Sequence, residues 1–571
     1  MAAKLWKNWR ENTKIWAIIW LIVAIYLFIH ILLYIFVDSK TLILLHSDDA
    51  YYYYKISSNY VNKGFLSFDS IHMTNGFHPL WFILLCPIFK LVGGFFLPLR
   101  VIGILTSVLM GFSIYISLLY LKRNYSLIAV LISFLGILGY VTYFNRSNME
   151  TSILIPLCLL VLFLADKWNI WELKNVEVNK LILVGIIMAF AQMARLDEIF
   201  LNLMIIVTLI IINFKSIRNK AILTKLLAVV FPSLISGFLY VSVNYILFGV
   251  NYILFGHLLP VSGAAKSLGA PGLNLALVHQ IKSSLFPNTI FSLSSIYHLV
   301  SVILFALCIV YILVYVVIEK KDISKYETKY LSKSTATLAL IISLFYTLYI
   351  SYYLLFSSWP LWEWYFYPSM LVVVCIVPRF VELLLGSVQN IFGSYIKKIT
   401  SIISILLIFC ALLFTIVIAP GSILIPAPHY DPEKSAIGYM YGNYVLAQYV
   451  NENFSEDTIF AMGDCAGSFG YFCNCKVIQL EGLVNDYDFL DTLRNNEVES
   501  YLTKNGVDYV VAVTYGLDAN NYTMYTISPN AEAKIRVYKE CQIYFDSIGK
   551  KQIFVWFWPC CDNKSHKDEV I

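Results

Sequence analysis

The chain has 571 residues, of which 59% are hydrophobic, 16% aromatic and only 13% charged. This composition excludes an ordinary water-soluble globular protein, in which about a quarter of the residues are charged. The net charge of +5 is small for this length and gives no indication of a nucleic-acid partner. We therefore expect a polytopic α-helical membrane protein in contact with membrane lipids.

Apolar stretches of about 20 residues, long enough to cross the core of a bilayer, recur through the first 420 residues. The first of them is too long for the core of a signal peptide and lacks a small-residue cleavage site, so we expect it to be retained as an anchor. The predicted spans are 15–37, 100–121, 126–144, 150–166, 180–195, 198–213, 221–248, 299–318, 335–356, 366–386 and 399–419.

Residues 79–98 are equally apolar, but the basic residues argue against a twelfth crossing. With a cytoplasmic N-terminus, eleven spans keep the lysine-rich loops, such as 167–180 and 320–333, on the cytoplasmic side. We therefore predict that 79–98 is a helix on the outer membrane surface, interrupted by Pro87 and by Gly93-Gly94. The same count predicts a multi-pass protein of the plasma membrane with its C-terminal part outside the cell.

The first external loop begins with two adjacent carboxylates, Asp48 and Asp49, followed by four tyrosines. Because two adjacent carboxylates repel each other, one is expected to have a raised pKa suited to a general base. Alternatively, the pair binds a divalent metal ion, the only cofactor that the sequence suggests. The structural alternative is a solvated helix start.

The same loop continues with TNGFHPLW. Asn75-Gly76 indicates a turn, and Pro79 suits the first turn of a helix. His78 would then lie at the positive end of that helix, where anions such as phosphate bind. A histidine in an interfacial aromatic belt is the alternative.

Further candidates lie at the predicted outer ends of later spans. Glu150 opens a span, and Arg195 lies beside Asp197 and Glu198 in an otherwise apolar stretch. Charges at that depth usually face a cavity or one another, so both a site role and an Arg195–Asp197 structural pair remain open.

Two external segments complete the set of candidates. The irregular stretch from His257 to Ser267 carries His257 and Lys266, which suits either a phosphate-binding loop or a flexible one. In WPLWEWYFYP, aromatic residues surround Glu363. That pattern suits sugar stacking with an acidic partner, and equally the aromatic belt of a membrane interface.

After Pro420 the chain becomes more polar, and we predict a membrane domain at 1–420 and an extracytoplasmic α/β domain at 421–571. Asp464 and Glu481 follow predicted strands, either as binding residues or as contacts with the membrane domain. Six cysteines lie in this part, where an extracellular location makes disulfides plausible, and the spacing of Cys473 and Cys475 is a weak signal for a metal.

The loop DDAYYYYKIS, the motif TNGFHPLW and the run IQLEGLVNDY…YLTKNGVDYVV together carry a resemblance. The chain resembles the GT-C superfamily of integral-membrane glycosyltransferases, which includes protein O-mannosyltransferases, aminoarabinose transferases and arabinofuranosyltransferases. The resemblance covers most of the chain and implies a GT-C fold with surface helices in the first external loop.

The resemblance also implies an activity: inverting transfer of one sugar from a polyprenyl-phosphate donor to an acceptor hydroxyl on the outer face, in cell-envelope glycan or glycoprotein assembly. The acceptor would be a glycan, a lipid or a protein. The family's base corresponds to Asp48, with Asp49 as a helper or metal ligand. Its donor-phosphate contact corresponds to His78, where aminoarabinose transferases have lysine. Arg195 and Lys266 are further phosphate candidates from their charge and predicted side.

Two other classes of function remain open. A transporter or flippase of lipid-linked sugars could use the charges near Arg195, and a non-catalytic envelope assembly protein could use the outer loops as docking surfaces. The sequence has no internal repeat of transporter type and no glycine-rich nucleotide loop. Its chemically rich segments all fall on one predicted side, which favours the transferase.

Overall fold

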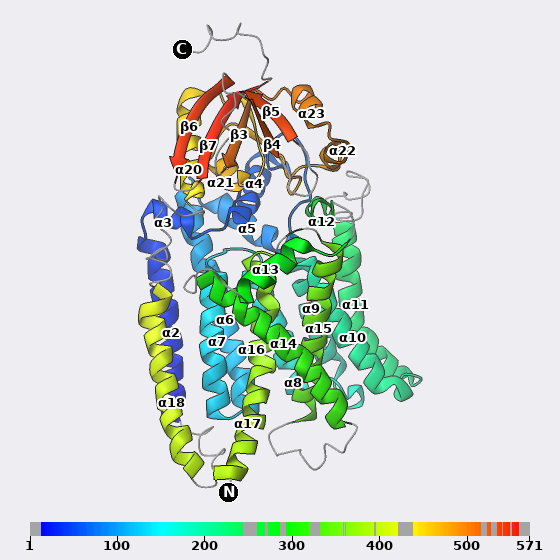
Figure 1. Ribbon diagram of the computed structural model, residues 1–571. Coiled ribbons are helices and arrows are strands. Elements are labelled where there is room, and N and C mark those ends of the chain that lie inside the picture. The colour runs from blue at the N-terminus through cyan, green and yellow to red at the C-terminus, as the bar shows by residue number, and fades with distance from the viewer. Residues whose placement is uncertain are drawn as a thin grey trace.

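The computed structural model describes residues 13–243, 260–268, 272–285, 293–319, 332–357, 359, 361–392, 395–420, 438–514, 522–526, 534–538, 541–548 and 551–558. It consists of a long helical bundle with a smaller α/β domain at one end (Figure 1). The start of the first helix lies at the opposite end of the bundle from this domain.

Within the described residues, ten helical stretches are long and apolar enough to cross a membrane. An eleventh helix, α9, is apolar but has only 17 residues. Each of the eleven predicted spans therefore corresponds to a helix. These helices are α2 (Thr13–Phe36), α6 (Phe96–Asn124), α7 (Leu127–Asn145), α8 (Thr151–Trp168), α9 (Val178–Ala194), α10 (Ile199–Asn213), α11 (Lys220–Val243), α14 (Leu293–Glu319), α15 (Lys333–Phe356), the consecutive α16 (Tyr367–Cys375) and α17 (Val377–Phe392), and α18 (Tyr395–Leu413).

Shorter helices connect the spans. At the end of the bundle nearer the α/β domain these are α3 (Ser39–Leu44), α4 (Asp48–Lys63), α5 (Pro79–Leu91), α12 (Val261–Lys266) and α13 (Leu275–Leu285). The remaining short helices are η1 (Leu173–Asn175), η2 (Leu196–Glu198), η3 (Phe214–Ser216), η5 (Glu363–Phe366) and the π-helical η6 (Phe414–Ile418).

Helix α5 confirms that 79–98 does not cross the bundle. Its N-cap residue is His78, and Pro79 occupies the first helical position, where a missing N–H costs nothing. Just beyond its C-terminal end, the carbonyl of Phe95 accepts a hydrogen bond from Tyr471 of the α/β domain. The predicted break at Pro87 is wrong, because the helix continues through it to Leu91. The glycine pair does end the helix, and Gly94 has a φ of 75°.

Several described segments next to the loops predicted to be cytoplasmic meet at the far end of the bundle. A cavity of about 590 Å³ there is lined by residues from the ends of α6, α8 and α10 and from the start of α15. Arg123, Asp166 and Lys333 are among them. The described parts of these loops thus share one end and the α/β domain occupies the other, in agreement with the count of eleven spans.

The C-terminal domain has the predicted α/β character. Its five-stranded sheet has the order β2-β1-β3-β7-β6, in which β1 pairs in parallel with β2 and β3, and β7 pairs antiparallel with β3 and β6. A separate antiparallel pair joins β4 and β5. The strands are β1 (Ile459–Met462), β2 (Lys476–Gln479), β3 (Tyr509–Thr514), β4 (Tyr522–Thr526), β5 (Lys534–Tyr538), β6 (Gln542–Ile548) and β7 (Lys551–Phe557), and the helices are α20 (Tyr439–Asn453), α21 (Ala466–Phe472), α22 (Tyr487–Asn495) and α23 (Val498–Lys504).

The disulfides that we expected in this domain are absent from the part that the structure describes. Cys465, Cys473, Cys475 and Cys541 are free thiols, so none of them forms a disulfide. Cys560 and Cys561 lie outside the described residues.

The bundle and the α/β domain meet through α4 and α5, which lie between them (Figure 1). The YYYY motif explains this junction, since all four of its tyrosine side chains are buried. The ring of Tyr51 contacts those of Tyr471 and Phe472 from α21, with centroids 5.4 and 5.6 Å away. The first loop is therefore part of the core that joins the two parts.

Candidate functional site

The two carboxylates of the first loop begin helix α4, and Ser47 is its N-cap residue. Acidic residues are favourable in the first turn of a helix because of the positive end of its dipole. The backbone N–H and the hydroxyl of Ser47 both donate to the carbonyl of Ser147, at 3.2 and 2.8 Å. These bonds fix the start of α4 against the loop that leads to Glu150.

The loop before Glu150 is held by a polar residue that the sequence reasoning did not select. Asn148 is fully buried with a φ of 50°, and its amide donates to the carbonyl of Leu45 and to the hydroxyl of Tyr34. The side-chain oxygen of Asn148 accepts a hydrogen bond from the hydroxyl of Thr106 at 2.7 Å. An asparagine beside an apolar span was the available signal, because asparagine tolerates positive φ and satisfies buried polar groups.

Glu150 and Arg195, predicted separately, form one buried ion pair. The Arg195 guanidinium donates to Glu150 Oε1 at 2.7 Å and to both carboxylate oxygens of Asp197, at 3.0 and 2.7 Å. The predicted Arg195–Asp197 pair thus exists but has Glu150 as a third member. The side chain of Arg195 is only 4% exposed.

Tyrosines complete this network. Tyr349 and Tyr353 donate to Asp197 Oδ2 at 3.2 and 2.9 Å, and Tyr367 donates to Glu198 Oε2 at 3.1 Å. In contrast, Oε2 of Glu150 is buried and has no hydrogen-bond partner among the described residues. A buried carboxylate oxygen without a partner is rare and marks a position where a further donor would fit.

Lys266 adds a second cation, from helix α12. Its ammonium group donates to the hydroxyl of Tyr365 at 2.6 Å and lies 5.4 Å from the centre of that ring, which also lies 4.8 Å from the Arg195 guanidinium carbon. Asn75 positions α12, because its side-chain oxygen accepts from the N–H of Val261 at 2.8 Å. Burial alone would lower the pKa of Lys266, but Tyr365 and Asp49 outweigh it and raise that pKa.

His78 lies in the same region, with Nε2 4.0 Å from Glu150 Oε1. Burial lowers its pKa to about 4, and the nearby Arg195 and Lys266 act in the same direction. His78 is therefore a neutral hydrogen-bonding group at the start of α5 and not a cation.

Asp48 and Asp49 have different surroundings. Asp48 Oδ2 accepts from the N–H of Gly467 at 2.9 Å, and Oδ1 accepts from the N–H and the hydroxyl of Ser468, at 2.9 and 2.7 Å. Asp49 is half-buried and accepts no side-chain hydrogen bond from the residues that the structure describes. Burial raises the pKa of Asp49 to about 7, in spite of the opposing charge of Lys266.

The C-terminal domain brings two more carboxylates to this region. Glu481 is buried, accepts from the amide of Gln479 at 3.0 Å, and has its pKa raised by burial and by the charges of Asp464 and Asp49. Asp464 follows β1 and is exposed. Asp464 and Glu481, the two residues that follow predicted strands, therefore lie close enough to Asp49 to interact with it electrostatically.

The divalent metal ion at the pair of adjacent carboxylates stays a prediction. Both oxygens of Asp48 already accept hydrogen bonds. In the described part of the chain, no group of three or more His, Cys, Asp or Glu side chains is arranged to hold a metal ion.

Two predicted residues cannot be placed in the site. His257 lies outside the described residues. Glu363 begins η5, but its side chain is not among those described.

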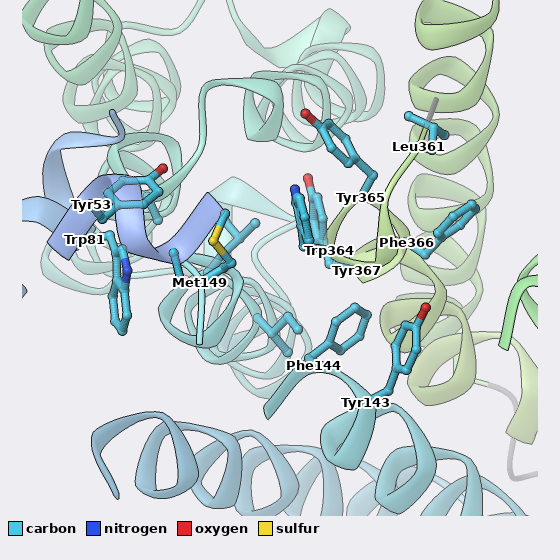
Figure 2. Packing of buried hydrophobic residues seen from close by; sticks show 14 of the residues in the cluster. Tyr53, Trp81, Tyr143, Phe144, Met149, Leu361, Trp364, Tyr365, Phe366 and Tyr367 are labelled. Carbon is cyan, nitrogen blue, oxygen red and sulfur yellow. The ribbon is translucent and has the colours of Figure 1, made fainter. Parts of the chain in front are cut away.

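Aromatic side chains surround the residue before Glu150. Figure 2 shows Tyr53 and Trp81, from α4 and α5, on one side of Met149, with Trp364, Tyr365 and Tyr367 on the other. Trp364 and Tyr365 come from the predicted WPLWEWYFYP motif and are buried. That motif therefore contributes to the lining of the site, and its exposed Trp362 is the residue that fits an interfacial belt.

No protein-family model and no curated protein sequence matches the chain. Two solved structures are similar to it over 94% of its length and 97% of theirs: ArnT from Cupriavidus metallidurans bound to undecaprenyl phosphate, with 10% identity and a TM-score of 0.52, and the same protein in the apo state, with 11% identity and a TM-score of 0.53. At this identity the similarity concerns the fold. It confirms the GT-C fold that the sequence motifs implied.

Proposed function

We propose that this chain is an inverting glycosyltransferase that moves one sugar from a polyprenyl-phosphate donor to an acceptor hydroxyl at the outer face of the plasma membrane. The observation that carries the proposal is the meeting of Asp49, Lys266 and the Arg195–Glu150 pair at one end of the bundle. A half-buried carboxylate opposite cations is the combination that transfer from a lipid phosphate requires.

The proposed transfer reaction requires a base and cations that stabilise the leaving phosphate. The donor sugar is joined to the polyprenyl chain through a phosphodiester, so the phosphate is already a leaving group. Asp49 removes the proton of the acceptor hydroxyl while that oxygen forms a bond to the anomeric carbon from the face opposite the phosphate. The bond from the anomeric carbon to the phosphate oxygen breaks, and the departing polyprenyl phosphate gains a negative charge.

Lys266 and Arg195 are suited to stabilise that new charge. Both cations lie against the ring of Tyr365, in surroundings where water is scarce and electrostatic attraction is stronger than in bulk. His78 adds a neutral hydrogen bond at the start of α5, where free backbone N–H groups also favour an anion.

The geometry favours Asp49 over Asp48 as the base. The resemblance assigned that role to Asp48, but three donors of the C-terminal domain occupy its two oxygens. Those donors occupy the oxygens with which Asp48 would accept a proton, and they oppose the rise in its pKa that burial causes. Asp49 has free oxygens among the described residues, and a pKa of about 7 is close to the value that suits a base at neutral pH.

Three further observations support the location and the lipid donor. The basic loops gather at the end away from the site, as expected for a cytoplasmic side. The bundle has enough apolar helices to span a membrane. The structure of ArnT, which has the same fold, was solved with undecaprenyl phosphate bound.

The test is transfer by the Asp49→Asn variant in lipid nanodiscs supplied with a panel of radiolabelled undecaprenyl-phosphate hexoses and pentoses and with envelope extract as acceptor. We expect kcat to fall by on the order of 10²-fold or more, because general-base catalysis contributes about that much. Binding of undecaprenyl phosphate should be unchanged, because Lys266 and Arg195 remain.

Asp38→Asn is the matched control, since Asp38 caps α3 in the same part of the chain and asparagine caps a helix equally well. Transfer by Asp49→Asn at the wild-type rate would remove Asp49 from the mechanism. A wild-type protein that transfers none of the sugars would contradict the proposed function itself.

A further inference from the structure

The carboxylate of Asp48 is bound in a pocket that belongs to the C-terminal domain. Its three donors are the N–H of Gly467 and the N–H and hydroxyl of Ser468, which lie 419 and 420 residues further along the chain. Both residues belong to the first turn of α21, where backbone N–H groups have no partner within the helix. We call these contacts the Asp48 clasp.

The clasp is itself held in a fixed geometry. The side-chain amide of Asn443 donates to the hydroxyl of Ser468 at 2.9 Å and to the carbonyl of Cys465 at 2.8 Å. Cys465, just before α21, has a φ of 72°, which is unusual for a residue other than glycine and persists only when surrounding contacts enforce it.

Position 467 requires glycine. A Cβ atom there would lie 2.2 Å from the carbonyl oxygen of Asp48 and 2.8 Å from its Oδ2. The close approach of α21 to α4 therefore depends on the absence of a side chain at this residue.

Domain attachment alone does not account for the clasp, because other contacts already join the two parts. Lys55 donates to the carbonyl of Cys473 at 2.8 Å, and Tyr471 donates to that of Phe95 at 2.8 Å. The ring of His72 lies between Asp69 and Asn505, 2.7 and 3.0 Å away. The clasp differs from all of these in its target, which is the residue next to Asp49.

The consequence for Asp49 follows from helix geometry. Successive residues of an α-helix point about 100° apart. When Asp48 is held by α21, Asp49 is directed elsewhere, into the region that contains Lys266 and Glu150. Burial raises the pKa of Asp48 as well, but the three donors oppose that rise, and Asp49 accepts no such side-chain hydrogen bonds from the described residues.

We propose that Gly467 and Ser468 are positioning residues of the transfer reaction: by holding Asp48, the C-terminal domain directs Asp49 toward the acceptor hydroxyl and is thereby part of the active site. This inference rests on the proposed function. It makes the C-terminal domain a participant in the chemical step, in addition to any role in acceptor binding.

The experiment compares Gly467→Ala and Ser468→Ala with wild type in nanodiscs, with the undecaprenyl-phosphate sugar that the wild-type protein transfers. Gly467→Ala displaces Asp48, and we expect kcat to fall by on the order of 10²-fold, as for a misplaced reacting group. Ser468→Ala removes only one donor to a charged group, so we expect a loss of about tenfold. Ser468→Thr keeps the hydroxyl and should restore most of the rate.

Two readouts separate positioning from simple loosening of the domain. The KM for the donor should stay within about twofold, because the cations are untouched. The pH at which kcat/KM is half-maximal should rise, because a released Asp48 carboxylate lies nearer to Asp49 and opposes its ionisation. His72→Gln is the matched control: it weakens domain attachment at Asn505 without touching Asp48, and should change neither kcat nor the pH profile.

The outcomes are distinguishable. Equal losses in Gly467→Ala and His72→Gln without a change in the pH profile would overturn the positioning role. If Gly467→Ala fails to fold, the test rests on Ser468→Ala. Wild-type kinetics in Ser468→Ala would overturn the positioning role and leave the proposed function unaffected. A wild-type protein without transfer activity would overturn both.

Discussion

The two ends of the helical bundle hold their charged residues in different ways. At the end away from the C-terminal domain, Arg123 pairs with Asp166 at 3.2 Å beside an open cavity. The arginine side chain is 51% exposed, and the buried aspartate also accepts a hydrogen bond from Asn124 at 2.8 Å. At the other end, Arg195 is 4% exposed and binds Glu150 and Asp197.

The difference separates charges that border water from the buried charges that we propose to act in the site. An ion pair whose cation is exposed is partly screened by water, so it contributes little to stability and the desolvation cost of its arginine is small. A buried arginine with two carboxylates carries a large desolvation cost, which only close pairing and further hydrogen bonds can offset. At the second end, Glu150 Oε2 has no hydrogen-bond partner among the described residues, so this network has room for one further donor.

Removal of the buried cation should have the largest effect in this comparison. Arg195→Met would leave Glu150 and Asp197 buried without their partner, and we expect a loss of about 3–5 kcal/mol of stability together with loss of transfer. The measurement is reversible unfolding in detergent micelles followed by tryptophan fluorescence.

Arg195→Lys sharpens the same test. Lysine keeps the charge but lacks the planar fork that reaches two carboxylates, so an intermediate loss is expected. A loss of stability below about 1 kcal/mol in Arg195→Met would show that Glu150 and Asp197 do not need the arginine charge to remain buried.

The pH dependence of transfer should be the next largest effect. Asp49 must be ionised to accept a proton, and its pKa is raised to about 7. We therefore expect kcat/KM to fall about tenfold for each pH unit below 7 and to be constant above it. Lys266→Met should move the midpoint upward, because the lysine charge lowers the pKa of Asp49. A rate that is constant between pH 5 and 7 would exclude Asp49 as the base.

The smallest effect is expected at the far end. Arg123→Gln removes a cation that is half exposed to water, and Asn124 still donates to Asp166 at 2.8 Å. We therefore expect less than about 1 kcal/mol of destabilisation and no more than about a twofold change in transfer. If this variant is as damaging as Arg195→Met, the contrast between the two ends is wrong.

The fold was largely predictable, because its determinants are local. Each of the eleven predicted apolar stretches corresponds to a helix or, for 366–386, to two consecutive helices. The distribution of basic residues correctly predicted that 79–98 does not cross the membrane domain. Pro87 was misjudged, since a proline can remain inside a helix whose neighbours satisfy the freed carbonyl. The disulfides were also misjudged at the described cysteines, since a shared compartment does not bring two thiols together.

The site was predictable only as a set of candidates. Charge and sidedness selected Asp49, Glu150, Arg195 and Lys266, but no sequence spacing indicates that Arg195 bonds to Glu150 or that Lys266 bonds to Tyr365. The motif made Asp48 and Asp49 look equivalent. Helix α21, more than 400 residues away, separates them by binding one and leaving the other.

The sequence by itself therefore determined that this chain crosses a membrane, which loops share a side, and which residue types gather there, because hydrophobic length and charge act on each segment independently. The tertiary structure alone decided which carboxylate is bound and which is available. That choice depends on hydrogen bonds between distant segments, whose strength changes with ångström-scale differences in position.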